Sequence, residues 1–163
     1  GAGVNEWQII DELMNHARFD IFLLANRYTL LDQQVIDTLL PRVEREGVAI
    51  VDGAPLNSGI LATGPIPNAV YDYAQASSEM IEKTRRIEQL CSKHGTTLIR
   101  AALNFPLGHS AITSIIPGFS NVAEFNDNLA GYRKAIPDAL WAELRAEGLL
   151  HPNAPGPVTP ILA

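Results

Sequence analysis

Short apolar runs alternate with helical patterns along the chain, and this order constrains the fold more than any other feature. Apolar runs occur at 20–25, 48–51 and 112–116, and residues 1–4 resemble the tail of another run. Nearly continuous apolar runs are typical of strands that are buried on both faces of a parallel sheet. Strands that alternate with helices favour a parallel sheet joined by right-handed crossovers. The sequence therefore predicts an α/β fold.

The segments between these runs carry apolar residues at helical spacing, together with residues that favour helix ends. Asn5 is a candidate N-cap, and Gly47 suits a helix C-terminus. Pro41 fits poorly inside its helix, because proline lacks the N–H donor and kinks the backbone. A segment rich in Gly, Pro and Asn at 56–75 is expected to be a long loop, and such loops are usually functional or mobile. The predicted helices span about 5–14, 32–45, 77–94, 98–105 and 121–130, with a last one from 137 onward.

A single domain over 1–163 is expected, because 163 residues suffice for one hydrophobic core and no repeat or domain boundary is evident. Residues 151–163 are rich in proline and are expected to form an extended C-terminal tail. The opening Gly1-Ala2-Gly3-Val4 has no initiator Met and indicates the end of a strand that begins upstream. Two architectures fit the order of elements: a small doubly wound sheet, or part of a (β/α) barrel.

Composition narrows the class of partner. Hydrophobic residues make up 47% and charged residues 18%, which excludes a disordered segment. The net charge of −6 disfavours nucleic acid and anionic membrane surfaces as partners. No apolar run approaches the roughly 20 residues of a membrane span, and no signal peptide is expected. The single Cys91 can form no internal disulfide and no multi-cysteine metal site. We expect a soluble, cytoplasmic protein without a metal site.

The segment 115–124 leads from a strand to a helix N-terminus through a turn at Gly118. Such a terminus presents free N–H groups and the positive end of the helix dipole, and is suited to bind an anion such as a phosphate. The same residues fit a capping box, in which Glu124 accepts from the N–H of the cap residue Asn121. The residues alone leave both interpretations open.

A second candidate segment, 53–59, directly follows a strand and contains small residues that let a flat ligand approach the backbone. An ordinary loop fits it equally well. Arg27 and Tyr28 follow another strand end, where they are placed to line a pocket. Cys91 lies on the apolar face of its helix, as an inert core residue does. The histidines are dispersed and none is assigned as a catalyst.

Four segments together resemble the aldo-keto reductase superfamily: 23–32 (LLANRYTLLD), 53–61 (GAPLNSGIL), 101–107 (AALNFPL) and the stretch from Ile116-Pro117-Gly118 to Asn128. Among its branches they resemble the aldose 1-dehydrogenases, which act on L-fucose or D-threo-aldoses, and pyridoxal 4-dehydrogenase. The opening Asn5-Glu6-Trp7-Gln8 suits the same branch. The resemblance covers nearly the whole chain in the right order.

The resemblance implies the C-terminal part, about strands 5–8, of a (β/α)₈ TIM barrel that binds a nicotinamide cofactor at the C-terminal strand ends. The family's catalytic Asp, Tyr, Lys and His belong to the first four strands, so no catalytic residue is carried over to this chain. The chain alone is expected to be inactive, and a missing N-terminal barrel half or a partner chain is expected to complete it.

The resemblance also implies the residues that hold the cofactor. Asn5 would bind its carboxamide, residues 53–58 would run along the nicotinamide and pyrophosphate, and residues 118–128 would hold the adenosine end. NADP-preferring relatives often have Lys at the position of Gly118 and Arg at that of Glu124, whereas a carboxylate repels the 2′-phosphate. NAD is therefore predicted over NADP, and Asp127 takes the place of a usual Glu. The cofactor-binding set is Asn5, Gly53, Ala54, Pro55, Leu56, Asn57, Ser58, Gly118, Ser120, Glu124, Asp127 and Asn128.

The implied activity is hydride transfer between the cofactor and a substrate carbon that bears oxygen, with an aldose oxidised at C1 to a lactone as the expected reaction. An aldose or aldehyde is the expected substrate, and Arg27 and Tyr28 are candidate substrate contacts. Two alternatives stay open: a nucleotide-binding half-barrel without chemistry, and a structural half that pairs with another chain.

Overall fold

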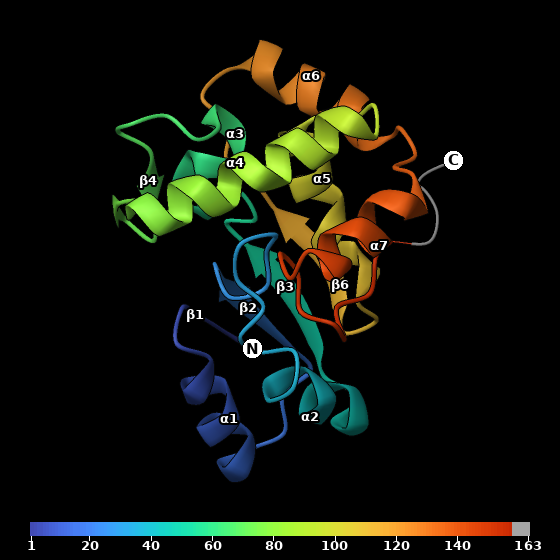
Figure 1. Ribbon diagram of the computed structural model, residues 1–163. Coiled ribbons are helices and arrows are strands. Elements are labelled where there is room, and N and C mark those ends of the chain that lie inside the picture. Colours follow the sequence, from blue (N-terminus) through green and yellow to red (C-terminus); the bar gives the residue numbers. More distant parts are fainter. Residues whose placement is uncertain (158–163) are drawn as a thin grey trace.

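Four parallel strands form the central sheet of the computed structural model, which describes residues 1–157. The strands lie in the order β1 (Ala2–Val4), β2 (Ile21–Ala25), β3 (Ala49–Gly53) and β6 (Ile112–Ile116), and each neighbouring pair is parallel. Every connection within the sheet therefore has to cross from one strand end to the other, and helices supply the crossings (Figure 1). The prediction of an α/β fold with a parallel sheet is confirmed.

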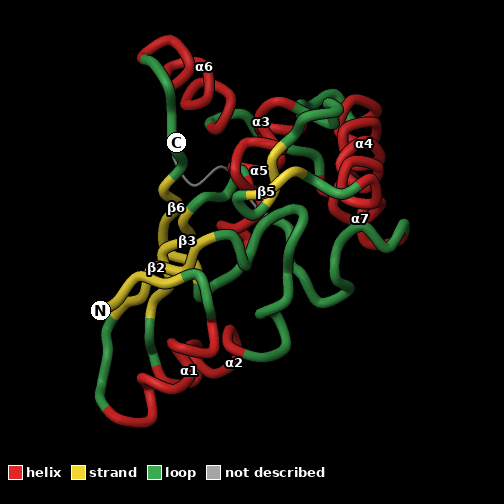
Figure 2. The backbone as a smooth tube through the Cα atoms, turned by 90° about the vertical axis from the view of Figure 1, so that its left-hand side faces the viewer, coloured by secondary structure: helices red, strands yellow, loops and turns green. Residues whose placement is uncertain are grey.

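Helices cover one side of this sheet. In Figure 2 the four strands lie toward the left, and α3, α4, α5 and α7 lie toward the right. The helices are α1 (Trp7–His16), α2 (Leu39–Glu46), α3 (Ile60–Thr63), α4 (Ser78–Lys93), α5 (Leu98–Asn104), α6 (Val122–Tyr132) and α7 (Asp138–Ala146). Two 3₁₀ turns, Asn57–Gly59 and Phe105–Gly108, and a hairpin of β4 (Val70–Tyr71) and β5 (Ala74–Gln75) complete the described elements.

The two faces of the sheet differ in how well they are covered. Phe22, Leu24 and Ile50 are buried in the core between the sheet and its helices. On the opposite face, Ile21 is 41% exposed and Ile116 is 53% exposed. Within residues 1–157, that face is not covered by a second layer, and β1 and β6 are the edge strands. The parallel sheet thus presents apolar side chains and two unpaired edges.

Two sequence predictions of local structure are corrected. The helix expected over 32–45 begins only at Leu39, and residues 34–38 form turns. This start places Pro41 in the first turn of α2, where a missing N–H does not interrupt the helix. The segment 56–75, expected as a loop, contains the first 3₁₀ turn, α3 and the hairpin. Of the predicted tail, residues 151–157 have no regular helix or strand, and 158–163 lie outside the described residues.

The pairing of β3 with β6 contains a one-residue irregularity. Ile50 pairs with Ile112, but the next residue, Val51, pairs with Ser114, so Thr113 is an extra residue in β6. The Thr113 hydroxyl donates to the backbone oxygen of Ile50 at 3.2 Å, which secures the bulge. Beyond the bulge, β3 and β6 pair regularly up to Gly53 and Ile116.

The lone Cys91 is fully buried in α4, and burial is the main reason that the pKa of its thiol is raised to about 12. No helix in the described part of the chain has the length and apolar character needed to cross a membrane.

Candidate functional site

The loops that follow the C-terminal ends of the four strands meet at one edge of the sheet, here called the C-terminal rim. Every residue other than glycine that has a positive φ among the described residues lies in these loops or in the β4–β5 hairpin. Such conformations cost about 1–3 kcal/mol each and concentrate at functional sites. The residues are Asn26, Ala54, Asn57, Ser58, Asp72 and Tyr73. Backbone strain therefore singles out the rim as the candidate site.

A cavity of about 360 Å³ opens on the rim between two segments. One wall is the β3 loop (residues 53–59) with α3, and the other is the β6–α6 turn (residues 117–121) with the start of α6. The lining brings together predicted site residues that are about sixty positions apart in the sequence. It consists of Ala54, Pro55, Leu56, Asn57, Ser58, Gly59, Ala62, Thr63, Ile99, Gly118, Ser120, Glu124 and Asn128.

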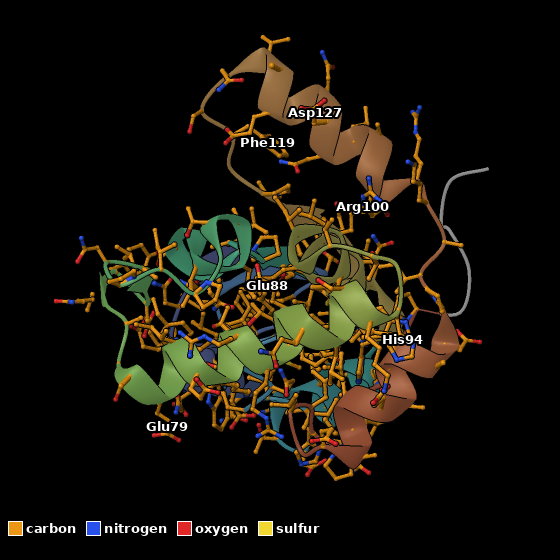
Figure 3. The ribbon with its side chains drawn as sticks, turned by 45° about the horizontal axis from the view of Figure 1, so that its top comes forward. Glu79, Glu88, His94, Arg100, Phe119 and Asp127 are labelled. Atoms are coloured by element: carbon orange, nitrogen blue, oxygen red, sulfur yellow. The ribbon has the colours of Figure 1, made fainter. Side chains whose placement is uncertain are left out.

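The β6–α6 turn is organised by a cap. The Asn121 side chain accepts from the N–H of Glu124 at 2.9 Å, and Glu124 accepts from the N–H of Ser120 at 2.6 Å. The capping interpretation needs one correction, because Glu124 binds the N–H of the residue before the cap rather than that of Asn121. Phe119 packs edge-on against Phe125 at 5.3 Å between ring centroids, and Figure 3 shows Phe119 beside the first turns of α6. The geometry holds the turn open toward solvent.

The β3 loop is built for close approach of the backbone. A Cβ added at Gly53 would lie 2.9 Å from Cδ2 of Leu23 and 3.3 Å from Cβ of Ala25, so only glycine fits without a shift. Asn57 is fully buried, and its Nδ2 donates weakly to the backbone oxygen of Asn26 at 3.4 Å. The Oδ1 of Asn57 has no protein partner. An unpaired acceptor thus lies buried beneath the cavity wall.

Unpaired polar atoms gather under the rim. Asn26 is fully buried with both side-chain amide atoms unpartnered, and Asp52 is 1% exposed with both carboxylate oxygens unpartnered. Burial raises the pKa of Asp52 well above its ordinary value, because water no longer stabilises the charged form. Polar atoms that are buried without partners lower the stability of the folded protein. This region has therefore not been optimised for stability alone.

The two candidate substrate contacts occupy different environments. Arg27 lies on the rim, where its guanidinium is bonded to the backbone of Asn5 and to Asp72. Tyr28 is fully buried, with its ring stacked on Phe105 at 5.2 Å between centroids, and burial raises the pKa of its hydroxyl. A substrate contact at Tyr28 does not fit this position, because the loop after β2 turns the ring into the core.

The remaining predicted residues, Asn5, Gly53 and Asp127, are not among those that line the cavity. Asn5 is half-buried after β1, and Asp127 is exposed on α6, outside the cavity lining (Figure 3). Sequence reasoning missed Asn26, although asparagine directly after a strand is a known signal for a left-handed backbone. It also missed Ile99 and Thr63, which carry no chemical signature. Within residues 1–157, no group of three or more His, Cys, Asp or Glu is placed to hold a metal ion.

Known proteins are similar to this chain in sequence and in fold. The family model described as "Aldo/keto reductase family" matches residues 1–147. The chain is 41% identical over 150 residues to a pyridoxal 4-dehydrogenase of Microbacterium luteolum, covering 92% of this chain and 44% of the relative. It is 33% identical over 154 residues to a D-threo-aldose 1-dehydrogenase of Pseudomonas sp, covering 94% of this chain and 46% of the relative. The chain thus spans less than half the length of these relatives.

Solved structures agree on the fold. An aldo-keto reductase of Bacillus halodurans, in its holo form, superposes with a TM-score of 0.69 at 17% sequence identity. The match covers 93% of this chain and 49% of that structure.

Proposed function

The chain belongs to the aldo/keto reductase family, and from that premise we propose that it forms the cofactor-binding part of an NAD-dependent oxidoreductase. The observation that carries the proposal is the rim cavity, which sets the β3 loop opposite the β6–α6 turn. Cofactors of α/β proteins bind at the carboxyl ends of the strands, where this cavity lies. The activity, the substrate and the partners of the whole protein are part of the proposal.

The residues of the cavity suit an extended dinucleotide. Small side chains at Ala54, Ser58 and Gly118 leave the backbone accessible, and a Cβ at Gly118 would meet nothing within 4 Å. The N-terminus of α6 adds a positive dipole end on the side proposed for the adenosine phosphate.

Each segment is assigned one part of the cofactor. We assign the carboxamide to Asn5, the nicotinamide and pyrophosphate to Gly53, Ala54, Pro55, Leu56, Asn57 and Ser58, and the adenosine end to Gly118, Ser120, Glu124, Asp127 and Asn128. When bound, the nicotinamide ring would supply hydride transfer to or from a carbon that bears oxygen. The residues of this chain bind and orient the cofactor, and we assign no proton transfer to them.

The charge of the cavity supports NAD over NADP. Among the described lining residues, Glu124 is the only one that carries a charge. Its carboxylate repels a 2′-phosphate but accepts a hydrogen bond from a free 2′-hydroxyl. Because Glu124 already accepts from Ser120, a bound ribose would share this carboxylate with the cap.

The substrate proposal is an aldose oxidised at C1 to a lactone. Its support is the name of the D-threo-aldose 1-dehydrogenase, at 33% identity. The name of the pyridoxal 4-dehydrogenase, at 41% identity, supports an aromatic aldehyde or hemiacetal instead. Both require oxidation at a carbon that bears oxygen, and both suit a cytoplasmic enzyme.

The uncovered sheet face supports a further part of the proposal. We infer that this chain is about strands 5–8 of a (β/α)₈ barrel and that other strands, from the same protein or a partner chain, pair with β1 and β6. Open parallel edges and exposed Ile21 and Ile116 would otherwise favour aggregation. The same open edges also fit the alternative, in which this chain only pairs with another chain and binds no nucleotide.

Cofactor preference gives the decisive experiment. In the protein expressed from its complete reading frame, we expect kcat/KM for NAD to exceed that for NADP by about tenfold or more, because like charges repel at Glu124. The double variant Gly118→Lys with Glu124→Arg should shift the preference toward NADP. The matched control is Glu79→Arg, a charge change on exposed α4 that should leave the preference unchanged. Equal or better use of NADP by the unmodified protein would refute the role of Glu124, and failure to bind either nucleotide would refute the proposed function.

A further inference from the structure

Arg27 joins three segments of the C-terminal rim. Its Nε donates to the backbone oxygen of Asn5 at 3.1 Å, and its Nη1 donates to Oδ2 of Asp72 at 3.1 Å. The same Nη1 lies 3.9 Å from Oδ2 of Asp32. The Arg27 side chain is only 17% exposed, so water competes weakly for these contacts. One guanidinium therefore connects the end of β1, the loop after β2 and the β4–β5 hairpin.

The turn of that hairpin has a conformation that its own residues disfavour. Asp72 has a φ of 48° and Tyr73 a φ of 64°. Two-residue hairpin turns with both φ values positive normally use Asn-Gly or Asp-Gly, because most side chains are strained there. Strained turns persist where surrounding contacts hold them. The contacts that hold this turn are therefore informative.

Two hydrogen bonds hold the turn against the rim. One is the bond from Arg27 to Asp72, and the other runs from the N–H of Tyr73 to Oγ of Ser58 at 3.0 Å. Ser58 belongs to the β3 loop and itself has a φ of 58°. The hairpin is thus bonded on one side to Arg27 and on the other to the loop that lines the cavity.

Two carboxylates, those of Asp32 and Asp72, face the guanidinium of Arg27. Tyr71, in β4, is half-buried close to Arg27, Asp32 and Asp72. Burial, followed by the nearby carboxylates of Asp32 and Asp72, raises the pKa of Tyr71 to about 12. The phenol therefore stays neutral at physiological pH and adds no further anion to the carboxylates of Asp32 and Asp72.

We propose that Arg27 is a positioning residue that holds the β4–β5 hairpin and Asn5 in place across the rim, and through them keeps the β3 loop in its nucleotide-binding conformation. Arg27 thereby takes a role different from direct contact with substrate. The effect on nucleotide binding rests on the proposed function, whereas the effect on the hairpin does not. Two separate readouts can therefore test the two parts.

The variants are chosen to divide the network. Arg27→Met removes both hydrogen bonds while keeping the length of the side chain. Asp72→Ala removes only the bond to the hairpin and leaves that to Asn5. Arg27→Lys retains the charge and should restore part of the function. The matched control is Arg42→Met, because Arg42 is 18% exposed and equally well bonded, but to Asp11, Asn15 and Glu46 on α1 and α2. Figure 1 shows these two helices at the lower end of the molecule, away from β4.

The first readout is cleavage by chymotrypsin after Tyr71 and Tyr73, followed by mass spectrometry of the protein from its complete reading frame. Tyr73 is 69% exposed but is held in the turn, so cleavage reports release of the hairpin. We expect cleavage to accelerate about tenfold in Arg27→Met and in Asp72→Ala, since each loses a charge-assisted bond, and to stay unchanged in Arg42→Met.

The second readout is NADH binding, measured by fluorescence, together with steady-state kinetics. We expect the Kd and the KM for the cofactor to rise about five- to tenfold in Arg27→Met, less in Asp72→Ala, and least in Arg27→Lys, while kcat changes little. A purely structural role would lower the amount of folded protein without moving the Kd of the folded fraction.

The outcomes separate the role of Arg27 at the hairpin from the proposed function. Unchanged cleavage in Arg27→Met overturns the inference, whatever happens to NADH binding. Faster cleavage with an unchanged Kd overturns the link to the β3 loop. If the unmodified protein binds no NADH but Arg27→Met is cleaved faster, the proposed function fails while the holding of the hairpin by Arg27 is supported.

Discussion

The two ends of the sheet are built by different rules. At the end where the strands begin, α2 closes with Gly47 at a φ of 70°, a conformation that glycine adopts without strain. There Arg42 donates hydrogen bonds to Asn15 on α1 and to Glu46 on α2. At the C-terminal rim, non-glycine residues adopt positive φ values, and Asn26 and Asp52 are buried without partners. One end is optimised for stability, whereas the other keeps strain and unpaired polar groups. This division is expected where ligands bind only at the carboxyl ends of parallel strands.

The largest effect on stability is expected from a substitution that leaves a cavity in the core, at the end of the sheet where the strands begin. Leu40 in α2 is fully buried, and Leu40→Ala should lower the free energy of unfolding by about 2–5 kcal/mol through lost contacts and the cavity left behind. Urea unfolding measures this loss, and Arg45→Ala, an exposed change on the same helix, is the control. NADH affinity of the folded protein should not change. A large loss of affinity in Leu40→Ala would mean that the two ends are coupled rather than separate.

A gain in stability is expected from a substitution of Asp52, which lies beneath the rim. The pKa of Asp52 is raised in the folded protein, so the folded state holds this proton more tightly than the unfolded chain does. Stability therefore falls as the pH rises above about 4, until Asp52 has lost its proton in the folded state as well. Asp52→Asn removes this loss and should be more stable than the unmodified protein at about pH 7, with a smaller difference at about pH 4.

Urea unfolding across this pH range checks the expectation, with the exposed Asp20→Asn as the control. If Asp52→Asn is instead the less stable protein at neutral pH, the carboxylate has a favourable role that its unpaired geometry does not reveal.

The smallest effect is expected at the helix cap. Asn121→Ala removes the acceptor for the N–H of Glu124 and should cost about 1 kcal/mol. Because the capped turn is one wall of the cavity, NADH binding should weaken as well. Asn126→Ala, an exposed change within α6, lacks the cap role and should change neither quantity. Equal effects of both variants would show that the cap does not shape the wall.

The sequence was most informative where the pattern is local. The strand predicted at 112–116 matches β6, and those at 20–25 and 48–51 lie within two residues of β2 and β3, because nearly continuous apolar runs are typical of the strands of parallel sheets. The resemblance to the aldo-keto reductases then implied a cofactor site at the C-terminal strand ends. The cavity does contain most of the residues named for the cofactor, but whether they bind it stays a prediction.

The rest depends on contacts between distant residues. The hairpin was missed because its turn is Asp72-Tyr73, without the glycine that marks such turns in a sequence. The bond from Arg27 to Asp72 joins residues 45 positions apart and leaves no trace in periodicity or spacing. Tyr28 was misplaced because an aromatic residue after a strand suits a pocket and a core equally well, and only packing on Phe105 decides between them.

The bulge at Thr113 preserves the direction in which the chain leaves β6. Side chains alternate between the two faces of a strand, so one residue more or fewer exchanges the faces of all the residues that follow. The bulge absorbs Thr113 as the extra residue, so Ser114 pairs with Val51 and Ile116 with Gly53, and Ile115 and Ile116 keep the faces that a regular ladder would give them. The loop that begins at Pro117 therefore leaves the sheet in the orientation it would have without the additional residue in the middle of β6.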